Sequence, residues 1–322
     1  MKAIRVNEQG PSDVMKLEEI PTPTPGEGEL LVKLEAIGLI YIDTYQRSGQ
    51  YPVPTPFTPG NEGAGVVEAV GAGVSGFQAG DRVCYTGVLG SYAEYALIPA
   101  ARAVTMPNGM ETRMGAAIML QGLTAHYLCR DTYAIKQGDS CLVHAGAGGV
   151  GLLLIQMCKM FGATVFTTVG TDEKAELARG AGADHVILYT KEDFEQAVLD
   201  KVGDNKLNVV YDSVAKDTFE KGLNLLRPRG LMVLYGASSG PVPPFELNTL
   251  AGKGSLFVTR PTLANYITTR EDLEKRSTEV LGWVAEGRLD VRIGSTFPLA
   301  GAKAAHDALT GRATTGKVLL IP

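Results

Sequence analysis

The segment HAGAGGVG, residues 144–151, is the feature that most constrains the fold of this chain. Its glycines have the spacing Gly146-x-Gly148-x-x-Gly151, between the apolar run SCLVHA and the helical pattern LLLIQMCKMFG. Such glycines permit a tight turn and a close approach of backbone N–H groups to a pyrophosphate, and the helix start adds partial positive charge. The motif therefore predicts a dinucleotide-binding βαβ unit; the alternative is a glycine-rich helix start without a ligand.

From about Gly138 onward, short apolar runs alternate with helical patterns of 10–15 residues, as in βαβ units and a parallel sheet. The strand candidates after SCLVHA are TVFTTVG, HVILY, NVVYDSV, LMVLYGAS and GSLFVTRP. The helix candidates between them are TDEKAELARGAG, EDFEQAVLDKV and DTFEKGLNLLRPRG. We therefore expect an α/β fold with a doubly wound parallel sheet in this half of the chain.

The first 120 residues are rich in proline and glycine, and their short apolar runs alternate with turns. Proline blocks helices and central strands, so this region reads as antiparallel and barrel-like. The tail STFPLAGAKAAHDALTGRATTGKVLLIP follows a strand, helix, strand pattern and is expected to return to the first domain. The predicted domains are 1–122, completed by 263–322, and 123–262.

Composition excludes several classes of protein. The net charge is −5, which argues against general nucleic-acid binding. No apolar run reaches the roughly 18 residues of a membrane span, and the start MKAIRVNEQG lacks a signal-peptide core. The four cysteines form no C-x-x-C pair. They indicate reduced thiols in a cytoplasmic protein rather than a disulfide framework or a zinc knot.

The residues after the second predicted strand favour NADPH over NADH. An NAD site has an acidic residue at the end of that strand, but TVFTTVG ends in Val169-Gly170. Asp172 follows where the next helix begins and, with Thr171, is better explained as part of a helix cap. Lys174 lies in the same first turn, where the helix dipole disfavours a cation and the 2′-phosphate of NADPH would favour one. An exposed lysine tolerated at small cost is the alternative.

The segment Gly138–Lys159, GDSCLVHAGAGGVGLLLIQMCK, resembles that of quinone oxidoreductases of the zeta-crystallin type. These form a zinc-free branch of the medium-chain dehydrogenase/reductase superfamily. The resemblance extends over the chain through IDTYQRSGQYP, GNEGAG, LQGLTAHYL, VVYDSV, GSLFVTRP and GRATTGKVLLIP. It implies a GroES-like catalytic domain, a Rossmann domain, bound NADPH and a homodimer.

The resemblance also implies the cofactor-binding residues. Those expected to contact NADPH are Tyr41, Ile42, Thr124, Tyr127, Gly148, Gly149, Val150, Gly170, Lys174, Tyr189, Ser213, Tyr235, Gly236, Ser238, Phe257, Val258 and Arg312. Within this set, Lys174 and Arg312 would share the 2′-phosphate, since two cations on one phosphate is favourable chemistry. Phe257 and Val258 would form the wall near the nicotinamide.

Zinc-dependent relatives have a cysteine and a histidine where this chain has Ile40, in AIGLIYID, and Asn61, in GNEGAG. A catalytic zinc needs three N, S or O ligands, so we predict no metal. The four histidines are isolated and are interpreted as packed or surface residues. Without a Lewis acid, reducing an electrophilic acceptor is easier than oxidising an alcohol. The protein then has to hold the acceptor, exclude water and offer a proton donor.

The stretch GLIYIDTYQRSGQYP, residues 38–52, is predicted to be the acceptor wall. Tyr45 and Tyr51 would line the pocket, where flat rings suit a flat quinone. Asp43 is the third catalytic candidate, as a proton relay or a ribose contact, or it pairs with Arg47 four residues on. Ordinary half-buried packing of the tyrosines is the alternative. Related quinone oxidoreductases usually have an asparagine at Ile40, so a polar anchor is missing here.

The predicted function is NADPH-dependent reduction of quinones, as hydride or as single electrons. The alternative within the same fold is reduction of a carbon–carbon double bond in enones, alkenals or 2-haloacrylates. A remoter reading is an RNA-binding or structural, crystallin-like protein. Another is a hydrolase, because GASSG fits the nucleophile elbow at Ser238 with His306 as base, although PVPPF follows where a helix is required.

The run GSLFVTRP is expected to be the last strand of the parallel sheet, and thus an exposed edge. An apolar edge strand is favoured to pair with another chain. We therefore expect a homodimer formed through this edge.

Overall fold

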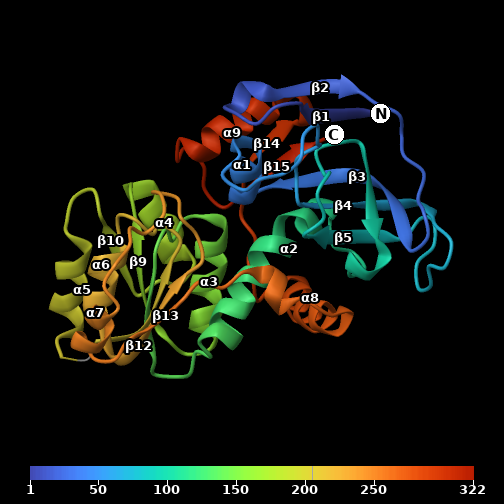
Figure 1. The fold of residues 1–322 in the computed structure, drawn as a ribbon. Helices are drawn as coiled ribbons and strands as arrows, with labels where there is room; N and C mark the ends of the chain where they lie inside the picture. The colour runs from blue at the N-terminus through green and yellow to red at the C-terminus, as the bar shows by residue number, and fades with distance from the viewer. Residues whose placement is uncertain (205) are drawn as a thin grey trace. The chain divides into compact units, whose positions relative to one another are not determined.

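The computed structural model describes residues 1–204 and 206–322, which form two compact units (Figure 1). Unit 1 comprises Met1–Leu123 and Ile267–Pro322, and unit 2 comprises Thr124–Tyr266. Each unit has its own sheet and its own apolar core. Among the described residues, no helix is both long enough and apolar enough to cross a membrane.

Unit 2 is built on a six-stranded sheet in the order β10-β9-β8-β11-β12-β13, and its neighbouring strands are all parallel. The strands are β8 (Ser140–Val143), β9 (Thr164–Val169), β10 (His185–Leu188), β11 (Leu207–Asp212), β12 (Leu226–Leu234) and β13 (Phe257–Thr259). The strand order reverses between β8 and β11, which is where doubly wound sheets bind their ligands. The predicted α/β fold is confirmed.

Helices connect these strands, as Figure 1 shows. They are α3 (Gly149–Met160), α4 (Asp172–Gly180), α5 (Phe194–Val202), α6 (Phe219–Leu225) and α7 (Asn248–Gly252). Side chains cap two of them: Thr171 accepts from the Lys174 N–H at the start of α4, and Asp193 accepts from two N–H groups at the start of α5. Such caps satisfy N–H groups that a helix leaves unpaired, so they fix where each helix begins.

One predicted helix was too long. The pattern DTFEKGLNLLRPRG indicated a helix through Gly230, but α6 ends at Leu225 and β12 begins at Leu226. Two residues explain the early end. Pro228 has no N–H to donate within a helix, and Arg229 has a left-handed backbone with φ 59°.

Unit 1 contains a seven-stranded sheet in the order β14-β15-β3-β4-β5-β7, with β6 paired to β3, and a separate β1-β2 pair. All these pairs are antiparallel except β14 with β15, which is parallel. The strands are β1 (Lys2–Val6), β2 (Met15–Glu19), β3 (Glu29–Leu39), β4 (Glu62–Val70), β5 (Arg82–Thr86), β6 (Tyr95–Pro99), β7 (Ala103–Thr105), β14 (Ile293–Pro298) and β15 (Lys317–Ile321). The predicted antiparallel architecture of the first 120 residues is confirmed, because all strand pairs within them are antiparallel.

The C-terminal segment belongs to unit 1 because β15 pairs with β3, with Val318 opposite Leu39. The α-helices of unit 1 are α1 (Tyr41–Ser48), α8 (Arg270–Ala285) and α9 (Ala302–Thr310). Helix α2 (Thr112–Tyr127) begins in unit 1 and ends in unit 2. Helix α1 follows β3 directly and ends at Gly49, whose φ of 83° favours glycine. The predicted acceptor wall is therefore a helix and the loop after it.

Candidate functional site

The glycine turn lies between β8 and α3, at the point where the strand order reverses. A Cβ on Gly146 would stand 2.0 Å from Thr167 Oγ1, and one on Gly151 would stand 2.4 Å from the Ala145 carbonyl oxygen. These two glycines bring the helix against the sheet. Gly148 is the N-cap of α3 and has no side chain to bond its first N–H groups. The turn therefore has the cradle that a pyrophosphate requires.

The glycines differ in what substitution should cost. Gly146→Ala is expected to lower the free energy of unfolding by about 1–3 kcal/mol, because the new methyl has no room. Gly148→Ala meets only the Ala145 carbonyl, at 3.2 Å. It should fold normally but weaken NADPH binding about tenfold by standing where the pyrophosphate approaches. Thermal unfolding and NADPH fluorescence titration measure the two effects. An equal loss of stability in both variants would refute the distinction.

The loops after β9 and β10 bring together three predicted adenosine contacts. A Cβ on Gly170 would lie 2.8 Å from Tyr189 Oη, so the tyrosine ring covers this glycine. Tyr189 is 44% exposed, leaving part of the ring accessible. Lys174 lies in the first turn of α4, and its backbone N–H donates to Thr171 Oγ1 at 3.3 Å. These residues flank the carboxyl ends of adjacent strands.

The second strand of this sheet ends without an acidic residue. Val169 is the last residue of β9, and Gly170 follows. Asp172 begins α4 and pairs with Lys191 at 2.7 Å, while Thr171 caps the helix. The interpretation of Asp172 as part of the helix start is confirmed.

The loops after β11 and β12 are also in contact. The Ser238 N–H donates to the Ser213 carbonyl oxygen at 3.0 Å, and a Cβ on Gly236 would lie 2.7 Å from the same oxygen. Tyr235 follows β12 directly and is half-buried. Four predicted cofactor contacts therefore form one surface at the carboxyl edge of the sheet.

The remaining predicted contacts of unit 2 differ in exposure. Thr124 and Tyr127 are 8% and 2% exposed, and the Tyr127 ring stacks on Tyr266 with centroids 4.1 Å apart. Phe257 is 59% exposed on the edge strand β13, beside the half-buried Val258. Of these four residues, Phe257 is therefore the one whose side chain is widely exposed.

In unit 1 the three tyrosines form one continuous aromatic surface. The ring centroids of Tyr41 and Tyr45 are 6.1 Å apart, and those of Tyr45 and Tyr51 are 5.2 Å apart. The Tyr51 N–H donates to the Tyr45 carbonyl oxygen at 3.0 Å, which returns the loop onto the helix. Tyr51 is 39% exposed and Tyr45 is half-buried. Such rings offer flat apolar area with a polar tip.

Asp43 is fully buried beneath this surface. Its carboxylate accepts hydrogen bonds from the Ile40 N–H at 3.1 Å, Asn61 Nδ2 at 2.7 Å and the Tyr92 hydroxyl at 3.0 Å. Burial raises the pKa of Asp43 to about 6, and these hydrogen bonds act in the opposite direction. Ile40 therefore bonds Asp43 through its backbone N–H, because its apolar side chain offers no hydrogen-bonding atom.

Arg47, which was one candidate partner of Asp43, lies against His306 instead. Arg47 NH1 is 3.4 Å from His306 Nδ1, and His306 Nε2 is 3.0 Å from the Tyr92 hydroxyl. Burial lowers the pKa of His306 to about 3, so its ring is neutral at pH 7. A neutral ring accepts from Arg47 at Nδ1 and donates to Tyr92 at Nε2. The Tyr92 hydroxyl can then donate to Asp43, so that each group donates to the next, from Arg47 through His306 and Tyr92 to Asp43.

A buried ion pair lies beside Asp43 and was not predicted from the sequence. Lys317 on β15 donates to Glu62 on β4, and both side chains are at most 1% exposed. The second oxygen of Glu62 accepts the Leu120 N–H of α2 at 2.8 Å. Gly38 must be glycine here, because a Cβ would stand 2.3 Å from the Glu62 carboxylate. The pair fastens three elements of unit 1 together.

The two positions at which zinc-dependent relatives have ligands are both buried. Ile40 is 4% exposed and Asn61 is 7% exposed. Within residues 1–204 and 206–322, no group of three or more His, Cys, Asp or Glu side chains is placed to hold a metal ion. The interpretation of His306 as a packed residue is confirmed by its complete burial.

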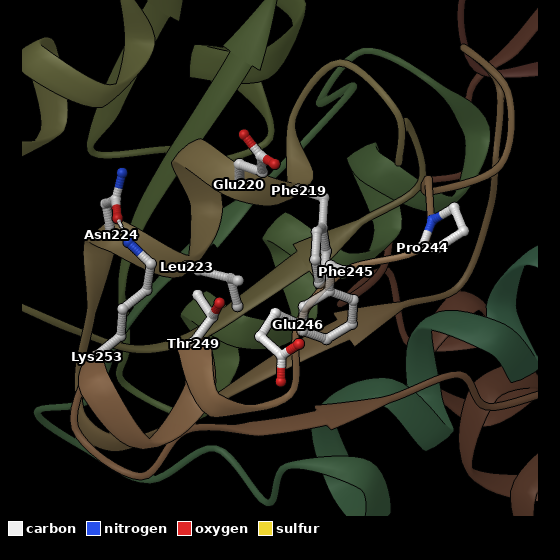
Figure 2. Close-up of a pocket in the computed structure, with 9 residues that line it drawn as sticks. All are labelled: Phe219, Glu220, Leu223, Asn224, Pro244, Phe245, Glu246, Thr249 and Lys253. Carbon is white, nitrogen blue, oxygen red and sulfur yellow. Dashed lines mark hydrogen bonds between the residues drawn. The ribbon is translucent and has the colours of Figure 1, made fainter.

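A separate cavity of about 450 Å³ lies in unit 2 against α6 (Figure 2). The rings of Phe219 and Phe245 meet edge to face with centroids 5.0 Å apart, and Figure 2 shows them side by side at the centre of the cavity wall. Lys253 donates to Asn224 Oδ1 at one end of it. The nine lining residues are all outside the predicted site.

The comparisons with known proteins agree with this geometry. Residues 26–108 match the alcohol dehydrogenase GroES-like domain, and residues 149–279 match the zinc-binding dehydrogenase family model. Together these define a medium-chain dehydrogenase/reductase.

More specific relatives cover the whole chain. It is 45% identical to a quinone oxidoreductase of Pseudomonas aeruginosa, over 100% of this chain and 99% of that protein. The crystal structure of Escherichia coli quinone oxidoreductase complexed with NADPH matches with TM-score 0.98 and 44% identity, over 100% of both chains. A 2-haloacrylate reductase of Burkholderia is 39% identical over 98% of both chains. The chain belongs to the quinone oxidoreductase family.

Proposed function

We propose that this protein is an NADPH:quinone oxidoreductase. The observation that carries the proposal is the similarity over the whole chain to quinone oxidoreductases, one of which was crystallised with NADPH. The structure adds a glycine cradle at the sheet's switch point and an aromatic surface on unit 1. RNA binding, a structural role and hydrolysis have no comparable support. Residues 235–247 after β12 contain no helix, so Ser238 does not lie on a nucleophile elbow.

NADPH supplies the reducing hydride when it is bound. Gly148, Gly149 and Val150 would hold its pyrophosphate, and Lys174 with Arg312 would bind its 2′-phosphate. The other expected cofactor contacts are Tyr41, Ile42, Thr124, Tyr127, Gly170, Tyr189, Ser213, Tyr235, Gly236, Ser238, Phe257 and Val258. Arg312 has a left-handed backbone with φ 59°, an unusual conformation for a non-glycine residue that is often associated with function.

Tyr45 and Tyr51 would hold the acceptor. Their rings meet at 5.2 Å and Tyr51 remains partly exposed, which suits a flat quinone. Asp43 is buried below them, so we propose that it acts by fixing α1 rather than by touching the acceptor. No metal is proposed, because Ile40 offers no ligand atom and the Asn61 amide is committed to hydrogen bonds with Asp43 and Gln46.

The second candidate is reduction of an activated carbon–carbon double bond, which the 39% identical 2-haloacrylate reductase favours. Steady-state NADPH oxidation with 1,4-benzoquinone, 2-chloroacrylate and an alkenal separates the two. We expect the quinone to have the largest kcat/KM by at least about tenfold. Turnover of 2-chloroacrylate exceeding that of every quinone would assign the protein to the second reaction.

The edge strand β13 supports a homodimer. It lies at the end of the sheet order, and Phe257 on it is 59% exposed. Leu247 is 71% exposed shortly before it in the chain. Pairing two β13 strands would cover the free N–H and C=O groups of this edge. Light scattering after size exclusion is expected to give twice the chain mass at micromolar concentration; a monomer mass would refute the dimer.

We also propose a cytoplasmic location. All four cysteines are buried free thiols, which suits a reducing compartment. Quinone and NADPH are then the expected partners, with no nucleic acid or membrane required.

A further inference from the structure

Asn61 makes two hydrogen bonds that tie one strand to one helix. It directly precedes β4, and its side chain is 7% exposed. Its Nδ2 donates to Asp43 Oδ1 at 2.7 Å and to Gln46 Oε1 at 2.7 Å. Asp43 and Gln46 lie three residues apart on α1, so they occupy the same face of that helix. A single amide group therefore uses both of its N–H donors to hold successive turns of α1. We call Asn61 and its two acceptors, Asp43 and Gln46, the clamp.

The base of this clamp is held firmly. The Gly87 N–H donates to the Asn61 carbonyl oxygen at 2.7 Å. Gly60, with φ 95°, brings the backbone so close to Tyr92 that a Cβ would stand 2.3 Å from its ring. Since Tyr92 also donates to Asp43, the ring that packs on the base bonds the same carboxylate. The clamp has little freedom to shift.

The clamped helix carries the aromatic surface. Tyr45 lies between Asp43 and Gln46 in sequence and contacts the Tyr51 ring. The Tyr51 N–H is bonded to the Tyr45 carbonyl oxygen, so the loop moves with the helix. A rotation or shift of α1 would therefore move both rings together.

We propose that Asn61 is a positioning residue that sets the acceptor-binding rings through α1. The inference rests on the proposed quinone reduction and deepens it. Zinc-dependent relatives are expected to have a histidine ligand at this position. This chain has an amide there instead, and its two N–H groups donate to Asp43 and Gln46 on α1. The proposed role of Asn61 requires no contact with acceptor or cofactor, since it acts through Asp43 and Gln46.

The test exchanges donor and acceptor. Asn61→Asp keeps the shape but removes both donors, and it faces Asp43 with a second carboxylate. Asp43→Asn alone faces the Asn61 amide with another amide. In the double variant Asn61→Asp/Asp43→Asn, the new amide donates to the new carboxylate, and its carbonyl still accepts from Ile40 and Tyr92. The Gln46 amide can turn to donate as well. Only the double variant restores the tie.

Each variant is assayed with 1,4-benzoquinone and NADPH at about pH 8, since facing carboxylates share a proton at lower pH. Asn61→Asp and Asp43→Asn are expected to raise the KM for quinone about tenfold, with the KM for NADPH within about twofold of wild type. The double variant should recover most of the quinone KM. Asn61→Ser, which loses the reach without adding charge, is the second single variant should Asn61→Asp not fold. Tyr85→Phe, which removes a buried hydrogen bond to Ser91 elsewhere in unit 1, is the control and should change neither KM.

Hydrogen exchange of the α1 amides separates this proposal from the proposed function. Faster exchange over residues 41–48 in the single variants, reversed in the double variant, supports the clamp. Unchanged α1 exchange, or a quinone KM within about twofold of wild type in Asn61→Asp and Asn61→Ser, would overturn it. A wild-type protein that exchanges slowly at α1 but reduces no quinone would instead count against the function alone.

Discussion

Replacing Lys174 and Arg312 together with alanine is expected to raise the KM for NADPH about 100-fold and leave the KM for NADH almost unchanged. Each cation would contribute about tenfold, because a hydrogen bond between ionised groups is worth roughly 1.5–3 kcal/mol. The 2′-phosphate is the only group that distinguishes the two cofactors. Neither substitution changes a residue of the glycine turn, nor Tyr45 or Tyr51, the proposed acceptor contacts.

Three features of these residues support the expectation. The end of β9 provides no acid for a ribose 2′-hydroxyl, since Val169 is followed by Gly170. Lys174 stands in the first turn of α4, where a cation is unfavourable unless an anion is bound. Burial raises the pKa of the Tyr41 phenol and the Arg312 guanidinium acts in the opposite direction, so this cation lies near α1.

Lys191→Ala is the matched control. Lys191 is an exposed cation close to the start of α4, where it pairs with Asp172. Its removal should change the KM for NADPH by no more than about twofold, because exposed pairs contribute little. Equal KM values for NADPH and NADH in the wild-type protein would refute the assignment of Lys174 and Arg312. Single and double variants measured with both cofactors also show whether the two effects add.

Lys317→Met is expected to destabilise unit 1 by about 3–5 kcal/mol, the largest stability effect of any single change considered. Glu62 would then be a buried carboxylate with only the Leu120 N–H as partner. Burial already lowers the pKa of Lys317 to about 7, with Asp43 acting in the opposite direction. The lysine is tolerated in this interior because it pairs with Glu62 and lies close enough to Asp43 for that carboxylate to favour its charge.

The double variant Glu62→Gln/Lys317→Met is expected to recover most of this loss. The glutamine that replaces Glu62 is neutral and its oxygen can still accept the Leu120 N–H, so no buried charge is left unpaired. Guanidinium unfolding followed by the fluorescence of Trp283, the chain's only tryptophan, reports unit 1, because Trp283 lies on α8. A single variant as stable as the wild type would show that the pair does not stabilise the barrel.

Local patterns predicted much of unit 2. The glycine spacing and the alternation of apolar runs with helical patterns located β8, α3 and the parallel sheet, because these features depend on neighbouring residues. The helix predicted through Gly230 was wrong because apolar residues continue past Leu225, whereas Pro228 and the left-handed Arg229 are incompatible with a helix there.

The polar interior of unit 1 could not be predicted in the same way. Glu62 and Lys317 are 255 residues apart in the chain, so no local pattern links them. Asn61 was interpreted only as an absent ligand, although its amide holds Asp43 and Gln46. The contact of Tyr45 with Tyr51 is easier to predict from the sequence, since both belong to one short segment in which a glycine ends the helix.

The most direct test of the central claim, metal-independent reduction of a quinone by NADPH, is turnover of chelator-treated protein. The protein is dialysed against a strong zinc chelator, its metal content is measured by mass spectrometry, and NADPH oxidation by 1,4-benzoquinone is then followed. We predict that kcat is unchanged and that the bound metal is far below one ion per chain. Loss of turnover on chelation, restored by added zinc, would contradict the account.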